Sequence, residues 1–277
     1  MSAVSADAFM LPVGSGHRFC VLRWPGDRAR TRGSVLVAAP FAEELNKSRR
    51  TIALAAERMA ADGYAVLHMD NLGCGDSSGD FGDATWDEWI SDIGRGYALL
   101  ESRQEPPIWI WGIRAGALLA CALLTRIASA PHLLFWQPVT SGQQHLKQFL
   151  RLKVANAFLG ESSAGLSTDA LLGRLKAGES IEVAGYMLTP ALASGLASAE
   201  LDVPPGFTGR VVCLEQGNAA SQGTSAALAA RVQAWRRAGS AVTAMAVNCL
   251  PFWQTQQITE APELIDATLS CLREVEQ

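Results

Sequence analysis

The feature of this sequence that most constrains its fold is a regular alternation of short apolar runs with longer amphipathic stretches. The apolar runs have the length of buried strands, and the stretches between them have the period of helices. This alternation is typical of a mostly parallel sheet with helices on both faces, so we expect an α/β fold. The expected strands are His17–Trp24, Ser34–Pro40, Ala65–Asp70, Ile108–Trp111, His132–Gln137, Arg210–Glu215 and Ala241–Asn248. The expected helices of this sheet are Lys47–Asp62, Trp86–Ser102, Ala115–Ile127, Ser225–Ala238 and Pro262–Glu276.

The alternation is interrupted between residues 139 and 206. Gln143–Leu159, Asp169–Lys176 and Pro190–Ala199 have helical patterns, and no strand of convincing length is visible there. We therefore predict an α/β core of residues 1–138 and 207–277, with a helical cap of residues 139–206 inserted between two strands. A chain of 277 residues is long enough for one large α/β domain with such an insertion.

Charge and cysteine usage exclude several classes of protein. The formal net charge of −4 and the pI of about 5.6 argue against nucleic-acid binding, which normally requires a basic face. The six cysteines lie far apart with no histidine nearby, so we expect no metal, no cofactor and no disulfide scaffold. Residues 1–11 lack the regions of a signal peptide, and we expect a cytoplasmic location.

One apolar stretch, Ile108–Ala128, has the length of a membrane span. Arg114 lies within it, and an arginine in a lone span costs about 3 kcal/mol or more. Gly112 and Gly116 also divide the stretch. A buried strand followed by a buried helix explains it better, so we expect no membrane span.

Three turn-forming segments follow consecutive expected strands. They are A-A-P-F-A-E-E-L-N-K-S-R-R at 38–50, M-D-N-L-G-C-G-D-S-S-G at 69–79 and W-G-I-R-A-G at 111–116. In this order they resemble the turns of the α/β-hydrolase fold. The resemblance implies that the first supplies a backbone N–H of an oxyanion hole, and that the third is the strand-to-helix elbow of the nucleophile. We expect this fold, with its mostly parallel central sheet flanked by helices.

A more specific resemblance covers residues 36–125. The segments P-F-A-E-E-L-N-K-S-R-R at 40–50, L-G-C-G-D-S-S-G-D-F-G-D-A-T-W at 72–86 and W-G-I-R-A-G-A-L-L-A at 111–120 are similar to proteins called exosortase A system-associated hydrolase 2. These are α/β-hydrolase superfamily members of bacterial loci for exopolysaccharide production and PEP-CTERM protein sorting. The resemblance implies a second hydrolase and an acyl-activating ligase encoded nearby, and hence an acyl metabolite.

The residues of a Ser-His-Asp triad are missing from their expected positions. Arg114 occupies the nucleophile position of the elbow, and a guanidinium stays protonated and cannot attack an acyl group. Near the expected acid position Glu215 is the only carboxylate, and Asn218 stands about where an aspartate would be. The segment 248–257, which would carry the histidine, contains none. Ordinary serine hydrolysis is therefore not expected.

Other reactive side chains offer no clear replacement. We expect His17, His68 and His132 to be structural, and His145 to pack in the cap or lie at its surface, although it could reach a pocket. Cys74 has no nearby histidine to activate it. Ser77 and Ser78 have no visible base and are expected to cap their turn. An acidic run follows, and we expect it to cap helices and to be solvated, not to bind a cation. It consists of Asp76, Asp80, Asp83, Asp87 and Glu88.

Arg114 is the residue we expect to define the site. A buried guanidinium needs an anion, and Glu43 and Glu44, in the loop after the preceding central strand, are the natural partners. Either one of them pairs with Arg114 and the site is merely filled, or Arg114 binds a carboxylate, a phosphate or a thioester-linked acyl group.

Further candidate residues surround this position. In the ligand-binding alternative, backbone N–H groups of Phe41 or Ala42 and of Ala115 would assist. Trp253 occupies the region of the missing histidine and is expected to line the pocket with Phe252, which would make the cleft more apolar.

Two classes of function remain open from the sequence. In the first, the protein binds an acyl or other anionic small molecule, or a partner protein of the same locus, without triad chemistry. In the second, it is an ester or thioester hydrolase, or an acyl transferase, that uses unconventional residues. The missing base and nucleophile favour the first class.

Overall fold

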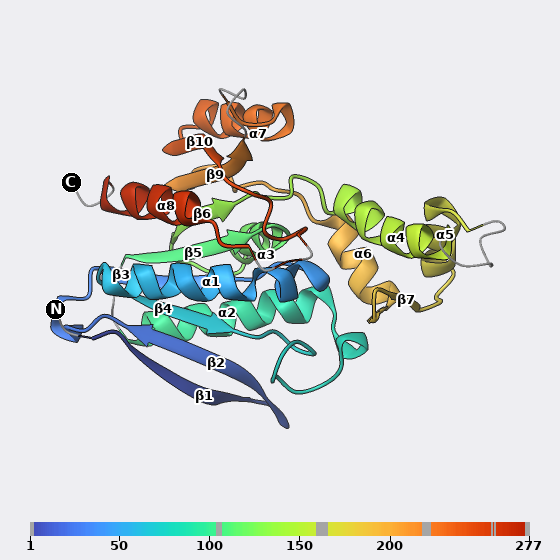
Figure 1. The fold of residues 1–277 in the computed structure, drawn as a ribbon, viewed down its shortest axis with the longest axis horizontal. Coiled ribbons are helices and arrows are strands. Elements are labelled where there is room, and N and C mark those ends of the chain that lie inside the picture. The colour runs from blue at the N-terminus through green and yellow to red at the C-terminus, as the bar shows by residue number, and fades with distance from the viewer. Residues whose placement is uncertain are drawn as a thin grey trace.

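A central eight-stranded sheet organises the chain in the computed structural model, which describes residues 3–103, 107–158, 166–217, 223–255, 257 and 259–274 (Figure 1). Its strands are β1 (Ser5–Val13), β2 (Gly16–Trp24), β3 (Gly33–Ala38), β4 (Tyr64–Met69), β5 (Ile108–Ile113), β6 (His132–Trp136), β9 (Val211–Gly217) and β10 (Val242–Asn248). Their order across the sheet is β1-β2-β4-β3-β5-β6-β9-β10. Every pair from β4 to β10 is parallel, and β1 and β2 add antiparallel strands at one edge.

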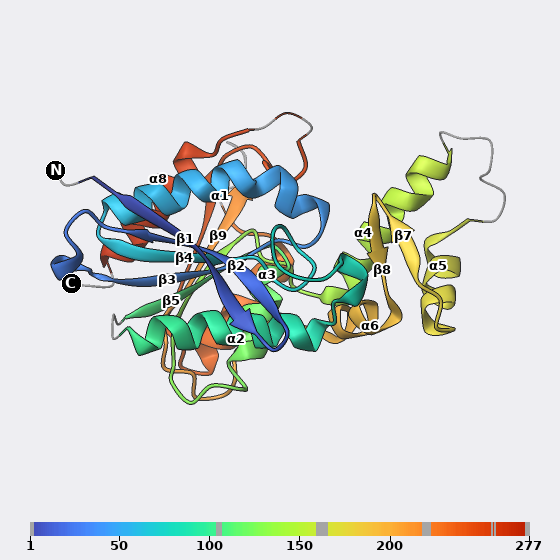
Figure 2. The same cartoon turned by 90° about the horizontal axis from the view of Figure 1, so that it is seen from below.

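Helices cover both faces of this sheet. Their bounds are α1 (Glu43–Ala61), α2 (Trp86–Ser102), α3 (Gly116–Leu123), α7 (Ala226–Arg237) and α8 (Pro262–Glu274). Helices α1 and α8 pack on one face, and α2 and α3 lie on the opposite face (Figure 2). The buried side of α7 belongs to the same core as α2 and α3. The expected fold class, a mostly parallel sheet flanked by helices, is confirmed.

The central strands β3, β5 and β6 are almost entirely apolar because both of their sides are buried. In β3, Leu36 points into the core under α2, and its neighbour Val37 points into the core under α1. The second core also contains the fully buried indoles of Trp109, Trp111 and Trp136. Each aromatic side chain removes about 150–250 Å² from water, so these residues contribute strongly to the packing of the sheet centre. Among the described helices, none is long and apolar enough to cross a membrane.

The segment between β6 and β9 leaves the sheet and lies beyond its carboxyl edge (Figure 1). It contains α4 (Gly142–Phe158), α5 (Thr168–Lys176), β7 (Ile181–Val183), β8 (Tyr186–Leu188) and α6 (Pro190–Ser198). The expected three helices are present, and the segment also holds a short β7–β8 hairpin that the sequence did not reveal. The hairpin contacts the core, since Asn46 Nδ2 donates to the Tyr186 hydroxyl at 2.7 Å. The predicted division at residues 138/139 and 206/207 stays a prediction.

Three local expectations were wrong or incomplete. Strand β1 was missed because it is an edge strand with little buried surface, so its sequence lacks the apolar alternation of a strand. Glu43 and Glu44 were expected in a loop, but they form the first turn of α1, which begins before the predicted Lys47. Helix α3 is shorter than predicted and ends at Leu123.

Candidate functional site

The turn between β5 and α3 brings strand and helix very close together. Arg114 follows the strand, and α3 begins at Gly116. A Cβ on Gly116 would lie 1.9 Å from the carbonyl oxygen of Ala38, and a Cβ on Gly112 would lie 2.6 Å from Cα of Ala117. Both positions therefore require glycine, and the elbow is formed by close contact between backbones.

Backbone strain is concentrated at this edge of the sheet. Ala42, Arg114 and Gln137 have φ values of 51°, 55° and 44°, and they follow the neighbouring strands β3, β5 and β6. Ala184, in the β7–β8 turn, is the other non-glycine residue of the described chain with positive φ. Such conformations cost on the order of 1–3 kcal/mol each and occur mainly at functional sites. The strain marks this edge as a site.

Arg114 is bound by Glu44 from α1. Nε of Arg114 donates to Oε1 and Oε2 of Glu44 at 3.1 and 3.2 Å, and Nη2 donates to Oε1 at 3.0 Å. Nη1 donates to the carbonyl oxygen of Gln137 at 3.2 Å. The arginine is 8% exposed and the glutamate 7%. This forked geometry is the strongest form of ion pair, and it fixes the guanidinium at the elbow.

Aromatic side chains surround the ion pair. The Arg114 guanidinium carbon lies 5.1 Å from the ring centroid of Trp253, within range of a cation–π contact. Phe41 contacts the rings of His145 and Phe149 edge-on, with centroid distances of 6.0 and 5.1 Å. These rings limit the access of water to the ion pair and strengthen its electrostatic attraction.

His145 reaches the site from the cap. Its Nε2 lies 4.0 Å from Oε2 of Glu44, and the residue is 5% exposed. Burial lowers the pKa of the imidazole; Glu44 acts in the opposite sense, and Arg114 lowers the pKa further. The ring is therefore neutral at neutral pH. The sequence favoured a packing or surface role for His145 over a position in a pocket, because only the fold shows which side of α4 faces the sheet.

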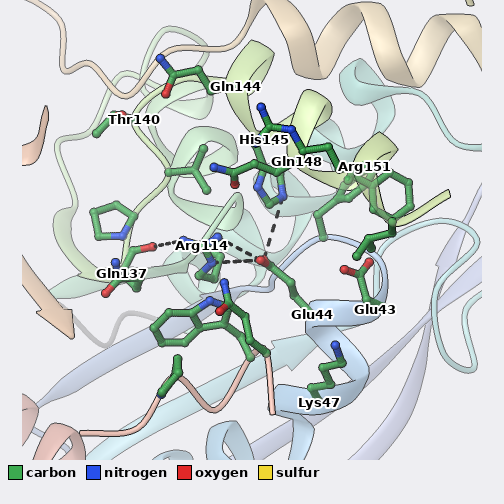
Figure 3. A pocket seen from close by; sticks show the side chains of 18 of the residues that line it. Glu43, Glu44, Lys47, Arg114, Gln137, Thr140, Gln144, His145, Gln148 and Arg151 are labelled. Atoms are coloured by element: carbon green, nitrogen blue, oxygen red, sulfur yellow. Dashed lines mark hydrogen bonds and ion pairs between the residues drawn. The ribbon is translucent and has the colours of Figure 1, made fainter. Parts of the chain in front are cut away.

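A cavity of about 680 Å³ lies between the sheet edge and α4 (Figure 3). Its wall contains most of the predicted site residues together with others that were not predicted. From the core come Phe41, Glu43, Glu44, Lys47, Arg114, Gln137, Gln216, Trp253 and Gln254, and from α4 come Gln144, His145, Gln148, Phe149, Arg151 and Leu152. Ala42 and Ala115 are buried and are not part of this wall.

Glu43 differs from its neighbour Glu44 in its surroundings. Its Oε2 is buried without a hydrogen-bond partner. Burial raises the pKa of this carboxyl, the charge of Glu44 raises it further, and Lys47 and Arg114 lower it. Glu43 is therefore an acid with a perturbed pKa in the cavity wall, which is a property of groups that bind or exchange protons.

The positions expected for the acid and the histidine of a triad hold Glu215 and Trp253. Glu215 is buried and accepts hydrogen bonds from the backbone N–H and, at 2.8 Å, from the hydroxyl of Ser225, the N-cap of α7. Asn218 lies outside the described residues. Trp253 stands in the segment where a histidine would be required. At the three positions where this fold carries its triad, the described residues are thus Arg114, Glu215 and Trp253.

The other candidates are occupied structurally. Burial raises the pKa of the Cys74 thiol to about 12, so it is not a nucleophile at neutral pH. Ser77 donates to the carbonyl oxygen of Asp70. Ser78 was expected to have no base nearby, but its hydroxyl lies 3.1 Å from Nδ1 of His17 and also accepts from the backbone N–H of His17 at 2.9 Å. Within the described ranges, no group of three or more His, Cys, Asp or Glu residues could hold a metal ion.

The polar wall contributed by α4 was missed. Gln144, Gln148 and Arg151 follow one another at helical spacing, and the adjacent stripe of His145, Phe149 and Leu152 has the same spacing. This repetition of polar and aromatic residues on one side of a helix was visible in the sequence. Nothing in it showed that this side faces the elbow.

A parallel sheet, a tight elbow after its central strand β5 and an inserted segment over the carboxyl edge together define an α/β-hydrolase. The chain belongs to the serine aminopeptidase S33 family, whose model matches residues 29–174, just over half of the chain. A comparison with curated proteins finds no match.

Solved structures support the same fold. A thermostable carboxyl esterase from Bacillus coagulans has a TM-score of 0.62 at 15% identity, with 99% of each chain covered. Est1E from Butyrivibrio proteoclasticus has a TM-score of 0.60 at 12% identity, with 97% of each chain covered. Alpha/beta hydrolase domain-containing protein 10 from mouse has a TM-score of 0.58 at 12% identity, with 98% of each chain covered. At these identities the similarity establishes the fold alone.

Proposed function

We propose that this α/β-hydrolase binds an acyl or other anionic small molecule in the cavity and does not hydrolyse it through a triad. The observation that carries the proposal is the ion pair of Arg114 with Glu44 at the elbow. The cation stands where the fold normally carries a nucleophile, and its partner holds it there. The cavity remains open beside it, with a volume in the usual range of small-molecule sites, about 300–1,000 Å³.

The charges of the wall support an anionic ligand. The charge of Arg114 is balanced by Glu44, whereas Lys47 and Arg151 have no ion-pair partner among the described residues. Burial raises the pKa of Glu43, which is the direction that favours its neutral form. Lys47 from α1 and Arg151 from α4 would therefore receive a carboxylate or phosphate between core and cap. Arg114 uses three of its five N–H groups on protein acceptors and has two left for a ligand.

The positions of these side chains change the roles expected for Arg114, Ala42 and Ala115. The alternatives for Arg114 were a filled site or a ligand site, and the proposal combines them, with Lys47 and Arg151 as the principal anion contacts. Ala42 and Ala115 lie outside the wall, so no direct ligand contact is proposed for their N–H groups.

The biological setting is proposed from the sequence resemblance. The segments 40–50, 72–86 and 111–120 are similar to exosortase A system-associated hydrolase 2. This similarity supports a role in a bacterial exosortase and PEP-CTERM locus for exopolysaccharide production, in the cytoplasm, with an acyl metabolite or proteins of that locus as partners.

The alternative is an ester or thioester hydrolase, or an acyl transferase, with unconventional residues. One observation favours it: Glu43, with its raised pKa, and the neutral His145 line the same cavity. Together they would provide an acid and a base, although neither replaces the missing nucleophile.

A labelling and turnover experiment separates the two. The purified protein is treated with a fluorophosphonate probe and assayed with p-nitrophenyl esters and acyl thioesters. The proposal predicts no labelling and no turnover, together with saturable binding of anionic ligands by calorimetry. Turnover that is abolished by Glu43→Gln or His145→Asn would decide for the enzyme.

A further inference from the structure

The cavity wall contains an unusual concentration of side-chain amides. Of the twelve glutamines in the chain, Gln137, Gln144, Gln148, Gln216 and Gln254 line this one cavity. They come from the end of β6, from β9, from the segment after β10 and from α4, so no single helix or loop explains the cluster. Figure 3 shows Gln144 and Gln148 extending from the cap side and Gln137 approaching Arg114 from the core.

Several of these groups have free hydrogen-bonding capacity. The amides of Gln144 and Gln254 make no hydrogen bond to another described residue. Three buried polar atoms in residues of the same wall are also without partners, namely Oε2 of Glu43, Nδ1 of His145 and Nε1 of Trp253. Trp253 is 3% exposed, so its indole N–H is cut off from bulk water. The exposed amides of Gln144, Gln148 and Gln254 are the groups that a ligand in the cavity can reach directly.

From this arrangement we propose that the ligand is a hydroxyl-rich acid of the sugar-acid class. The inference rests on the proposed binding function and specifies its ligand. A hydroxyl group both donates and accepts, and a glutamine amide does the same, so several hydroxyls on one ligand match several amides in one wall. Phe149 and Trp253 offer ring surface to the C–H groups of such a molecule.

The same wall is unfavourable for an unsubstituted acyl chain. Each alkyl segment placed against a glutamine would remove water from the amide and return no hydrogen bond. A hydroxylated acid keeps these bonds, while its carboxylate is received by Lys47 and Arg151. Lys47 and Arg151 alone would accept any small anion. The glutamine cluster favours those anions that also carry hydroxyl groups.

Matched pairs of ligands test the proposal on the full-length protein by titration calorimetry. D-gluconate is compared with hexanoate, and D-glucuronate with cyclohexanecarboxylate, so that each pair differs in its oxygen-bearing groups while the carboxylate is kept. We expect the hydroxylated member of at least one pair to bind about tenfold or more tightly than its counterpart. For that ligand, Gln144→Leu and Gln148→Leu should each raise Kd by about three- to tenfold.

Gln143→Leu is the matched control, since Gln143 is exposed on the same helix, as Gln144 and Gln148 are, but lies outside this wall. It should leave Kd unchanged. Equal affinity within both pairs would overturn the sugar-acid inference and leave the anion-binding function intact. Binding of methyl glucoside as tight as that of glucuronate would retain hydroxyl recognition and overturn the anionic function. An absence of binding by all of these ligands would overturn both.

Discussion

Glu44 and Arg114 are separated by seventy positions in the chain and are joined by three hydrogen bonds of 3.0–3.2 Å. One residue lies in the first turn of α1 and the other at the elbow after β5. The pair therefore connects the ends of two neighbouring strands, β3 and β5, at the position where this fold normally carries out chemistry. Its charge is balanced within the protein, and its removal has consequences for stability that can be measured.

Removing one partner of this pair should destabilise the protein more than removing both. Glu44→Gln leaves a buried guanidinium without its anion, and we expect a loss of about 3–5 kcal/mol in the free energy of unfolding. The double variant Glu44→Leu with Arg114→Met should recover a large part of this loss. Urea denaturation measures both. Glu179→Gln, which breaks an exposed pair with Arg174, is the control and should have no measurable effect. Equal losses in the single and double variants would contradict the buried pair.

Restoring a hydroxyl at the elbow should not restore hydrolysis. Arg114→Ser supplies a nucleophile, but Trp253 still occupies the region of the missing histidine, and Glu215 remains bonded to Ser225. We expect the rate of p-nitrophenyl acetate hydrolysis to equal that of the unmodified protein. Buffer without protein serves as the blank. A serine-dependent increase in turnover would show that another base completes the site.

The Glu43 carboxyl should make stability depend on pH in a defined direction. Burial raises its pKa above the ordinary value of about 4.3, so the folded state binds the proton more tightly than the unfolded state. Ionisation then costs stability as the pH rises through the folded pKa. Glu43→Gln removes this cost, and we expect the variant to be more stable than the unmodified protein at pH 7. The difference should disappear below about pH 4. A variant that is less stable at pH 7 would assign Glu43 a favourable ionised contact.

Anion binding should depend on Lys47 and Arg151 and weaken with salt. Lys47→Met and Arg151→Met should each raise Kd for an anionic ligand by about tenfold, because each removes one unpaired cation from the wall. Raising the NaCl concentration from about 0.05 to 0.5 M should also raise Kd, because salt screens the attraction between the anion and these cations. Arg237→Met, on the far helix α7, is a control of equal charge change. A Kd that is unchanged by both Lys47→Met and Arg151→Met would contradict this assignment.

The elbow should not tolerate a methyl group at Gly116. Its Cβ would lie 1.9 Å from the carbonyl oxygen of Ala38, and neither backbone can move without breaking the sheet. We expect Gly116→Ala to cost about 3 kcal/mol or more, measured by thermal denaturation. Gly173→Ala is the matched control, since nothing lies within 4 Å of its added Cβ in α5. There the substitution should be neutral or slightly stabilising.

Sheet and elbow could be predicted from the sequence because their residues are buried on both sides. The run 108–113 is apolar throughout, and Gly112 and Gly116 indicate where the chain turns. Strand β1 carried no such signal, because an exposed edge strand needs no apolar alternation. The fold was thus predictable where burial determines the residue type.

The site was only partly predictable for a geometric reason. Glu43 and Glu44 were equivalent candidates in a presumed loop, but successive residues of a helix point in directions about 100° apart. In α1 only Glu44 bonds to Arg114, and Glu43 is left without such a bond. The contributions of His145 and the glutamines depend on how α4 lies over the sheet, which is a tertiary property that no local pattern contains.

The hydrogen bonds between Glu215 and Ser225 set a condition for any redesign of this site. They assign the carboxylate to the start of α7, so a triad would require a hydroxyl at position 114, an imidazole near Trp253 and the release of Glu215. The release of Glu215 would also leave the backbone N–H of Ser225 without its acceptor. A single substitution at the elbow therefore leaves two further requirements of a triad unmet.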